Sequence, residues 1–499
     1  MKTPFYITTT LPYVNAALHV GHALEFIRAD AVARYKALLG FDVFFNTGTD
    51  EHGQKIFTKA LELHKTPQEF VDQGFSVFKK QVASFGVTDT VHYVRTTDEQ
   101  HIAAAQEFWK RVQGNGFIYK KNYEAKYCVG CESEKTDSEL VGGECPLHPG
   151  LHIETINEEN YFFKFSAFQD KLLAFYESTP DFITPAFRYN EMKTFVEGGL
   201  QDFSISRVKE KMAWGVPVPG DDTQVMYVWF DALVNYISTL GWFQSSEASG
   251  EGDPENLFEK YWIHGTPTQY CGKDNTRFQG VMWQAMLMAA DIPNSHKIVV
   301  NGFITADGGV RMSKTLGNVI DPFIVSTLYG VDVLRFFLLK EITSFEDSPF
   351  TMVRFLESYQ ANLANGLGNL VSRIMKMVEN YDVDYRLPTD EDLLEFDDAV
   401  PEGFKQKIDD FDLKSAMDDI WREVSGLDWL IQNKEPFKLA KTDMKGAQDI
   451  VAELATRLYI IGFLLQPFMP TTAQTIMTLV KEKKSPAEPL FKRLESITE

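Results

Sequence analysis

Two histidines stand where a predicted strand gives way to a predicted helix. His19 and His22 are three residues apart, so in the first turn of a helix they share one face. The free backbone N–H groups and the positive dipole end at this point favour an anion, and Gly21 lets an anion approach the backbone. These imidazoles therefore predict hydrogen bonds to phosphate. For the motif alone, two capping or core histidines are the alternative.

A second candidate group lies on a glycine-flanked basic loop far downstream. Arg311, Ser313 and Lys314 supply two cations and a hydroxyl. A strand-like stretch, 297–305, and a turn, 306–309, precede them. Alone, such a loop indicates a solvated hairpin. With the histidine motif in the same chain, it predicts a clamp that holds the phosphates of ATP from two sides.

Three cysteines and one histidine form two short hooks in the chain. Two residues separate Cys128 from Cys131, and two separate Cys145 from His148. This spacing suits four-coordinate Zn²⁺, and with four protein ligands the ion would be structural. A disulfide and a knuckle without metal are the alternatives. The remaining cysteine, Cys271, is predicted to be a buried apolar residue.

The elements that must position these groups alternate between strands and helices. Residues 5–10 are β-branched and aromatic, and apolar residues recur at helical spacing over 23–39. Beyond residue 350 the chain is mostly helical, with an acidic connection at 382–401. The fold predicted is α/β: a Rossmann-like parallel sheet interrupted by a zinc-knuckle connective insertion, followed by a C-terminal all-α helical bundle.

Composition restricts the class of protein. The chain has 499 residues, a formal charge of −21 and four cysteines. Its length predicts several domains, and its charge argues against a generally basic nucleic-acid-binding protein. Lysines gather at 434–445 and 481–484, where a local nucleic-acid contact and a solvated helix face are both open. We expect no membrane span and no signal peptide, and the few cysteines favour a cytoplasmic location.

The two motifs and the segments between them resemble the methionyl-tRNA synthetases, a family of class I aminoacyl-tRNA synthetases. The matching segments keep the family's order over essentially the whole chain. They are 11–15, 47–53, 214–219, 228–232, 272–274 and 316–318. The resemblance implies ATP-dependent ligation of methionine to tRNA(Met) through methionyl-adenylate, with release of AMP and pyrophosphate. It also implies that Mg²⁺ accompanies ATP.

The resemblance further implies roles for individual residues. Four residues would act in catalysis by binding phosphate oxygens or neutralising the leaving pyrophosphate: His19, His22, Arg311 and Lys314. The ATP-binding set contains those four together with Gly21, Gly272, Lys273, Asp274, Met312 and Ser313, of which Asp274 would hold the ribose. The methionine-binding set has Asp50 on the α-ammonium group and consists of Leu11, Tyr13, Asp50, Trp229, Ala232, Leu233, Tyr236, Phe278 and Gln279.

The helical region carries the residues that resemble the family's anticodon-binding set. Asn369 and Arg373 lie on a helix expected to run on from Glu357, and their amide and guanidinium groups suit splayed bases. Phe437 stands where the family commonly has a tryptophan that stacks on a base. Gln279 likewise replaces a usual histidine, and Arg311 replaces a usual lysine.

Changes in the strand, helix and loop patterns along the chain set the predicted domain limits, and the resemblance names the domains. They are the first catalytic half, 1–114; the connective insertion, 115–224, with its knuckle at about 125–150; the second catalytic half, 225–309; the basic loop and stem-contact region, 310–354; and the anticodon-binding domain, 355–499. The implied partners are tRNA(Met), methionine and ATP. We expect a monomer, because no further dimerisation domain is visible.

Two other functions compete with this one. Synthetases for isoleucine, valine, leucine and cysteine share both motifs. The first three carry an editing insertion for which the interval from His22 to Arg311 is too short, and a cysteine enzyme would need zinc in its pocket, where no predicted position is cysteine. A paralogue that only binds tRNA is the non-enzymatic alternative. Against it argue four intact residues: His19, His22, Lys314 and Asp50.

Overall fold

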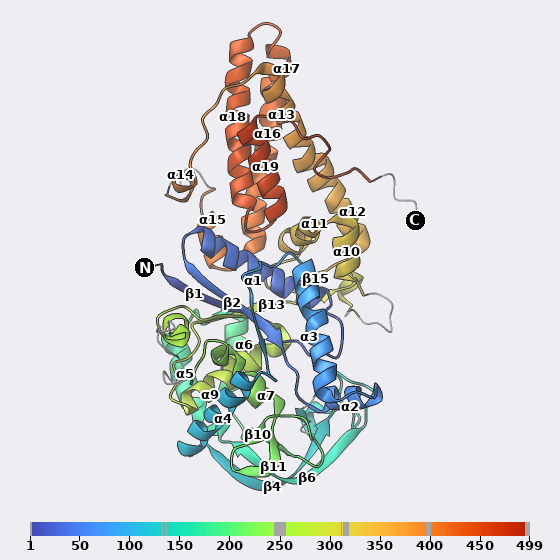
Figure 1. Ribbon diagram of the computed structural model, residues 1–499, viewed down its shortest axis with the longest axis vertical. Helices are drawn as coiled ribbons and strands as arrows, with labels where there is room; N and C mark the ends of the chain where they lie inside the picture. Colours follow the sequence, from blue (N-terminus) through green and yellow to red (C-terminus); the bar gives the residue numbers. More distant parts are fainter. Residues whose placement is uncertain are drawn as a thin grey trace. The chain divides into compact units, whose positions relative to one another are not determined.

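The chain divides into two compact units in the computed structural model (Figure 1). The structure describes residues 2–131, 133–135, 137–243, 256–310, 312, 319–395 and 401–494. Unit 1 consists of Met1–Leu18, Asp42–Gln81 and Thr90–Val300, and unit 2 of His19–Phe41, Val82–Asp89 and Asn301–Glu499. Among the described helices, none has the length and apolar character needed to span a membrane.

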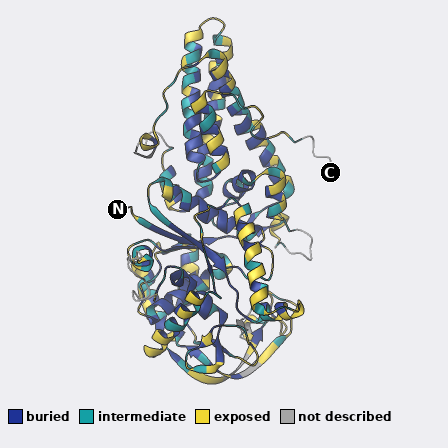
Figure 2. Cartoon of the chain, viewed as in Figure 1, coloured by how far each residue is buried: buried dark blue, intermediate teal, exposed yellow. Residues whose placement is uncertain are grey.

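Unit 1 is built on a six-stranded sheet of order β3-β2-β1-β12-β13-β7. The strands are β1 (Pro4–Thr8), β2 (Asp42–Thr49), β3 (His92–Arg95), β7 (Ile183–Thr184), β12 (Thr268–Gly272) and β13 (Lys297–Asn301). β1 pairs in parallel with β2 on one side and with β12 on the other. Both β1 and β2 are buried along most of their length, as in a parallel sheet covered on both faces (Figure 2).

The remaining strands of unit 1 form two antiparallel sheets. The larger has the order β5-β4-β6-β8 and contains β4 (Ile118–Cys128), β5 (Ser133–Lys135), β6 (Ile153–Phe163) and β8 (Phe203–Ser204). The smaller has the order β10-β11-β9 and contains β9 (Ser206–Val208), β10 (Pro217–Val218) and β11 (Asp221–Met226). β7 lies between these strands in the chain, yet it pairs with β13 of the parallel sheet.

Helices and an aromatic core complete unit 1. The helices are α2 (Gln54–Glu62), α3 (Pro67–Ser84), α4 (Glu99–Gly114), α5 (Gln169–Ser178), α6 (Ala186–Glu197), α7 (Val228–Ala232), α8 (Asn235–Ser238) and α9 (Trp283–Ala289). Phe108 and Trp109 of α4 pack on Trp283 and Phe230, with ring centroids 5.7 and 5.4 Å apart. These large buried rings fix α7, which carries several candidate site residues.

Unit 2 contains the helix that follows the histidine motif and a helical bundle. The helices are α1 (Val20–Leu38), α10 (Pro322–Tyr329), α11 (Val331–Phe336), α12 (Met352–Ser358), α13 (Gly368–Tyr381), α14 (Asp390–Glu395), α15 (Phe404–Asp409), α16 (Leu413–Lys434), α17 (Pro436–Leu439), α18 (Met444–Leu465) and α19 (Pro470–Glu482). Short strands β14 (Ile304–Thr305) and β15 (Ser348–Pro349) pair in parallel. Within the bundle, α13, α16 and α19 pack against α18 or one another and bury their inner faces (Figure 2).

Buried arginines position α1 within unit 2. Arg28 Nη1 donates to Asn301 Oδ1 at 2.8 Å and to the Ser344 carbonyl at 2.7 Å. Arg335 Nη1 lies 2.7 Å from Asp30 Oδ2, and both side chains are fully buried. Because buried charges require such partners, these contacts lock α1 to the segment that leads toward the basic loop.

The predicted fold class is confirmed, with two local differences. The stretch 297–305 forms two short strands, β13 and β14, rather than one. The prediction of a single helix after Glu357 is wrong. Gly366, at φ −85° and ψ −105°, interrupts a π-helical segment at Tyr359–Leu367 before α13 begins. Glycine lacks a Cβ, so the chain departs from helical geometry there at little steric cost.

Candidate functional site

The two motif histidines cap helix α1. His19 Nδ1 accepts a hydrogen bond from the Gly21 N–H at 3.1 Å, and His22 Nδ1 accepts one from the His19 N–H at 3.2 Å. The two rings stack with centroids 3.8 Å apart. The two histidines therefore do cap the helix, which is the alternative considered for this motif. This capping also settles the tautomer, because an accepting Nδ1 leaves the proton of a neutral imidazole on Nε2.

This geometry leaves two Nε2–H donors at the start of a helix. Burial, together with the neighbouring His19 ring, lowers the pKa of His22 to about 3. His22 is thus a neutral donor at physiological pH. Neutral donors joined to a helix N-terminus suit a phosphate group that itself carries the charge.

The basic loop is described only at its edges. Arg311, Ser313 and Lys314 lie outside the described residues, whereas Met312 is described and half-buried. The preceding turn is as predicted: the Ala306 N–H donates to the Val310 carbonyl at 2.8 Å. Gly308 and Gly309 have φ values of 67° and 77°, which favour glycine.

The structure brings the first predicted methionine-pocket residues together at the end of β2. Asp50 forms a parallel bridge with Tyr13, and its N–H donates to the Pro12 carbonyl at 3.1 Å. The Asp50 side chain is buried, with 4% exposure, and Leu11 is half-buried beside this bridge in the chain. A carboxylate in this setting suits a cationic partner such as an α-ammonium group.

A second part of the predicted pocket comes from α7 and the turn of helix at Arg277–Met282. Trp229 stacks on Phe278 with centroids 3.8 Å apart and planes within 6°. The Trp229 indole nitrogen and Gln279 Oε1 are buried and have no hydrogen-bond partner among the described residues. One donor and one acceptor thus remain available for a ligand. The other residues predicted for this part of the pocket are also buried; they are Ala232, Leu233 and Tyr236.

Sequence inspection missed a buried network that ties these two parts together. His52 Nδ1 lies 2.6 Å from Asp231 Oδ2, and His101 Nε2 lies 2.8 Å from Asp231 Oδ1. His101 Nδ1 in turn lies 2.8 Å from Ser238 Oγ. Burial alone would raise the pKa of Asp231, but the two imidazoles outweigh it and lower that pKa. The one available signal was an acid inside the apolar segment of α7, which requires partners.

The residue after Asp50 is held inside the protein. Glu51 accepts from Arg95 Nε at 2.9 Å and from the Thr49 hydroxyl at 2.7 Å. Its N–H donates to the Thr96 hydroxyl at 2.9 Å. With Glu51 and His52 both anchored, the backbone that carries Asp50 is fixed from one side.

The predicted ribose-binding segment is a tight turn directly after β12. Lys273–Asn275 form a single 3₁₀ turn, and Asp274 is exposed. A Cβ at Gly272 would lie 2.8 Å from Asp274 Oδ1, so this carboxylate folds back over the glycine.

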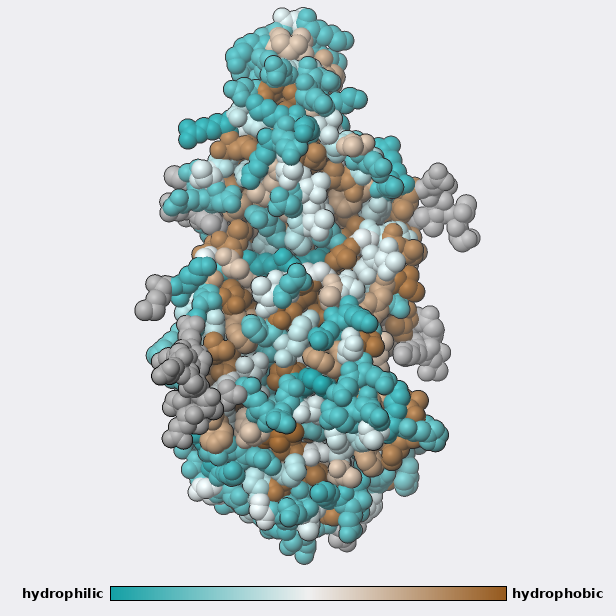
Figure 3. Space-filling view, in the orientation of Figure 1, coloured by the Kyte–Doolittle hydropathy of each residue, from teal (hydrophilic) through white to brown (hydrophobic). Residues whose placement is uncertain are grey.

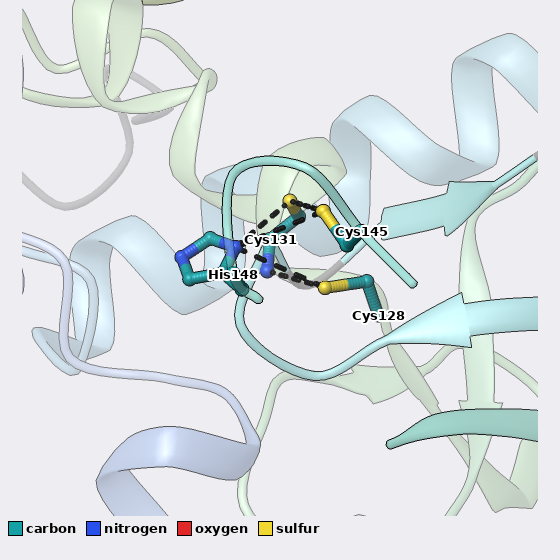
Figure 4. Close-up of side chains that lie close together, drawn as sticks. All are labelled: Cys128, Cys131, Cys145 and His148. Atoms are coloured by element: carbon teal, nitrogen blue, oxygen red, sulfur yellow. Dashed lines mark hydrogen bonds between the residues drawn. The ribbon is translucent and has the colours of Figure 1, made fainter. Parts of the chain in front are cut away.

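The predicted metal ligands converge (Figure 4). Sγ of Cys128, Cys131 and Cys145 and Nδ1 of His148 all lie within 4.8 Å of one another. The Cys131–Cys145 separation is 3.5 Å and the Cys131–His148 separation is 3.2 Å, close to the roughly 3.5–3.8 Å between ligands of tetrahedral zinc. A Cβ at Gly130 would lie 2.4 Å from the His148 ring, so glycine admits the histidine. All four cysteines are described and none forms a disulfide. The cluster fits zinc.

The predicted anticodon residues lie on the bundle of unit 2. Asn369 and Arg373 are half-buried and one turn apart on α13. Arg373 Nη1 donates to Asp428 Oδ1 of α16 at 2.5 Å. Phe437 on α17 is 45% exposed. Asp428 was not expected from the sequence.

Comparison with known proteins identifies the family that this chain matches. The family model "tRNA synthetases class I (M)" matches residues 5–154 and 149–375. The chain is 40% identical to a methionine–tRNA ligase of Caldanaerobacter subterraneus subsp. tengcongensis, covering 95% of this chain and 73% of that protein. It is 37% identical to a methionine–tRNA ligase of Brucella suis biovar 1, covering 96% of this chain and 92% of that protein.

A solved structure agrees with these relatives. Mycobacterium tuberculosis methionyl-tRNA synthetase in complex with methionyl-adenylate superposes with a TM-score of 0.85 at 36% identity. The match covers 96% of this chain and 93% of that one. The chain therefore belongs to the class I tRNA synthetases, within the family of methionine–tRNA ligases.

Proposed function

We propose that this protein ligates methionine to tRNA(Met) at the expense of ATP, through a methionyl-adenylate intermediate. The observation that carries the proposal is the near full-length match to a methionyl-tRNA synthetase that holds methionyl-adenylate. The buried carboxylate of Asp50 beside Tyr13 supports it, because an amino-acid substrate presents a cation.

The first step joins methionine to AMP. A methionine carboxylate oxygen attacks the α-phosphorus of ATP, the bond to the bridging oxygen breaks, and pyrophosphate leaves with that electron pair. In the second step a tRNA hydroxyl attacks the carbonyl carbon, and AMP leaves. Neither step requires more of the protein than positioning and charge stabilisation.

Residues of unit 2 would act on the phosphates. His19 and His22 would donate through Nε2–H, and Arg311 and Lys314 would neutralise charge on the leaving pyrophosphate. The half-buried Met312 and the hydroxyl of Ser313 complete the predicted loop, and Mg²⁺ would accompany ATP as it does in most phosphoryl chemistry.

Residues of unit 1 would hold the amino acid and the nucleoside. Asp50 would bind the α-ammonium group, and the stacked pair Trp229 and Phe278 would contact the thioether, at about 0.3–1.5 kcal/mol for each sulfur–aromatic contact. Gly272, Lys273 and Asp274 would meet the ribose of ATP, a role that suits the exposed Asp274 carboxylate.

Pyrophosphate exchange with a panel of amino acids tests the proposal. Methionine should support exchange of label from pyrophosphate into ATP, while isoleucine, valine, leucine and cysteine should not. Exchange with another amino acid would assign the chain to a different specificity. Absence of exchange with every amino acid, alongside tRNA binding, would identify a paralogue that only binds tRNA.

Lys314→Ala is expected to slow pyrophosphate exchange by at least about tenfold, the effect of losing one transition-state contact of about 1.4 kcal/mol. The reason is that its ammonium group would meet charge that appears only as pyrophosphate leaves. Initial exchange rates at saturating ATP and methionine measure the effect. Lys297→Ala, which changes a lysine of β13, serves as the control. Parental rates for Lys314→Ala would refute the role.

We also propose that zinc in the Cys₃His cluster stabilises the knuckle. Metal analysis should find about one zinc per chain. Cys128→Ala should lose that zinc and make the surrounding segment sensitive to limited proteolysis, because a structural zinc site is folded largely by its metal. Cys271→Ala, at a buried cysteine outside the cluster, is the control and should retain zinc. A metal-free parent protein with a resistant knuckle would contradict the assignment.

Anticodon recognition is proposed for Asn369, Arg373 and Phe437. Transcripts of tRNA(Met) with a CAU anticodon should be aminoacylated at least about tenfold more efficiently than transcripts with an altered anticodon, since a lost base contact costs roughly 1–3 kcal/mol. The measurement is kcat/KM for each transcript. Equal values would remove the assignment.

We propose that the protein is a monomer that works in the cytoplasm without a membrane partner, and that it is organised in the five predicted domain segments. Sedimentation of the purified chain tests its oligomeric state.

A further inference from the structure

One tryptophan of the helical bundle stands out by its exposure. All eight tryptophans lie in the described part of the chain. Trp429 of α16 is 63% exposed, whereas the other seven are buried or half-buried. A single exposed apolar side chain is ordinary, but an indole is a large apolar surface to leave in water without a partner.

Trp429 adjoins the candidate anticodon residues. Its neighbour Asp428 accepts the hydrogen bond from Arg373, so α16 meets α13 one residue before the indole. The Asn433 amide, one turn farther along α16, donates to the Trp429 carbonyl at 2.8 Å. Phe437, also exposed, follows in α17 directly after the turn that ends α16.

The charge of this region favours a polyanion. Lys434, Lys438, Lys441 and Lys445 follow Trp429 within sixteen residues. Lys438 and Lys445 pair with Glu435 and Asp449, whereas Lys434 and Lys441 form no ion pair with a described residue. Figure 3 shows this end of the bundle, at the top of the view, as mainly hydrophilic with a few apolar side chains among the polar ones. Exposed aromatic rings within a locally cationic surface are the features that bind single-stranded nucleic acid.

We propose that Trp429 is a second base-stacking residue, which together with Phe437 holds unpaired bases of the tRNA anticodon loop. The proposal rests on the proposed function, since that function supplies the RNA. Phenylalanine at position 437 offers a smaller ring than an indole. An additional indole eight residues earlier, presented by a neighbouring helix, adds stacking area that phenylalanine lacks.

Binding of a CAU-loop anticodon stem-loop RNA tests this inference. Trp429→Ala should weaken binding by about 5- to 150-fold, the loss of one stacked base, and Trp429→Phe should recover most of that loss. In the parent protein the RNA should shield the exposed indole from acrylamide, and Trp429→Phe should abolish that change in fluorescence. Leu61→Ala, at an exposed apolar residue of α2, is the matched control and should bind as the parent does. Melting temperatures should agree among the variants, because none of these side chains is buried.

Different contrary results would distinguish a wrong role for Trp429 from a wrong proposed function. Parental affinity for Trp429→Ala together with weak binding for Arg373→Ala would overturn the role of Trp429 and leave the proposed function standing. Parental affinity for both variants would remove the anticodon assignment itself. An equal loss on a blunt duplex of the same stem would show that Trp429 contacts the backbone and does not stack. Reduced self-association of Trp429→Ala, with unchanged RNA binding, would assign the indole to a protein contact instead.

Discussion

Replacing His22 by alanine is expected to lower the rate of ATP–pyrophosphate exchange by about 100- to 1,000-fold, the effect of removing one preorganised donor to developing charge. The reason is that the backbone N–H of His19 donates to His22 Nδ1. This hydrogen bond leaves the Nε2–H of His22 as a fixed donor at the start of α1. The variant also removes the hydrogen bond by which His22 completes the reciprocal cap with His19. The KM for methionine should change little, because the lost contact serves the phosphates.

The pH dependence distinguishes this donor from a proton-transferring base. A pKa lowered to about 3 means that His22 stays neutral, so no inflection from His22 is expected in the exchange rate between about pH 5 and pH 8. His264→Ala, which changes an exposed histidine of unit 1, is the control and should exchange normally. An inflection near pH 6.5 that disappears in His22→Ala would contradict a neutral donor.

The second large effect is expected for methionine binding. Asp50→Asn should raise the KM for methionine by about 100-fold, because truncating one partner of a buried charged pair costs roughly 2–5 kcal/mol. Asparagine keeps the volume of the side chain and removes only its charge. The KM for ATP should remain close to that of the parent. Exchange rates measured over a range of methionine concentrations give both constants.

Glu51→Gln provides a matched control for this substitution. Glu51 is the next residue and is also buried and acidic, and its carboxylate accepts hydrogen bonds from Arg95 and Thr49. The control should therefore lower the free energy of unfolding without a selective change in the KM for methionine. If the two variants raise that KM equally, Asp50 acts through the fold and not through the substrate.

The network around Asp231 shows which part of the candidate site was open to prediction. An acid within α7 requires partners, a demand that the sequence makes visible. The partners are His52 and His101, which are 179 and 130 residues away in the chain. No local pattern identifies them, because packing of the aromatic core brings α4 and the end of β2 to α7.

Local features were predictable because their causes are local. The cap formed by His19 and His22 depends on atoms at most three residues apart, and the hooks Cys128–Cys131 and Cys145–His148 depend on two intervening residues. Parallel strands and amphipathic helices follow from apolar periodicity. Where a glycine interrupted the pattern, at Gly366, periodicity alone could not show that the helix would break.

The amino-acid sequence by itself determined the chemistry that is available: imidazoles at a helix start, a four-ligand metal cluster, a buried acid and a parallel α/β sheet. Only the tertiary structure decided which distant groups meet, as with Asp231 and its two imidazoles or Arg373 and Asp428. The physical reason is the separation along the chain at which each interaction acts. Capping, turns and periodicity involve residues a few positions apart. A buried charge, in contrast, pairs with a group that can be distant in the sequence and is brought close only by packing of the core.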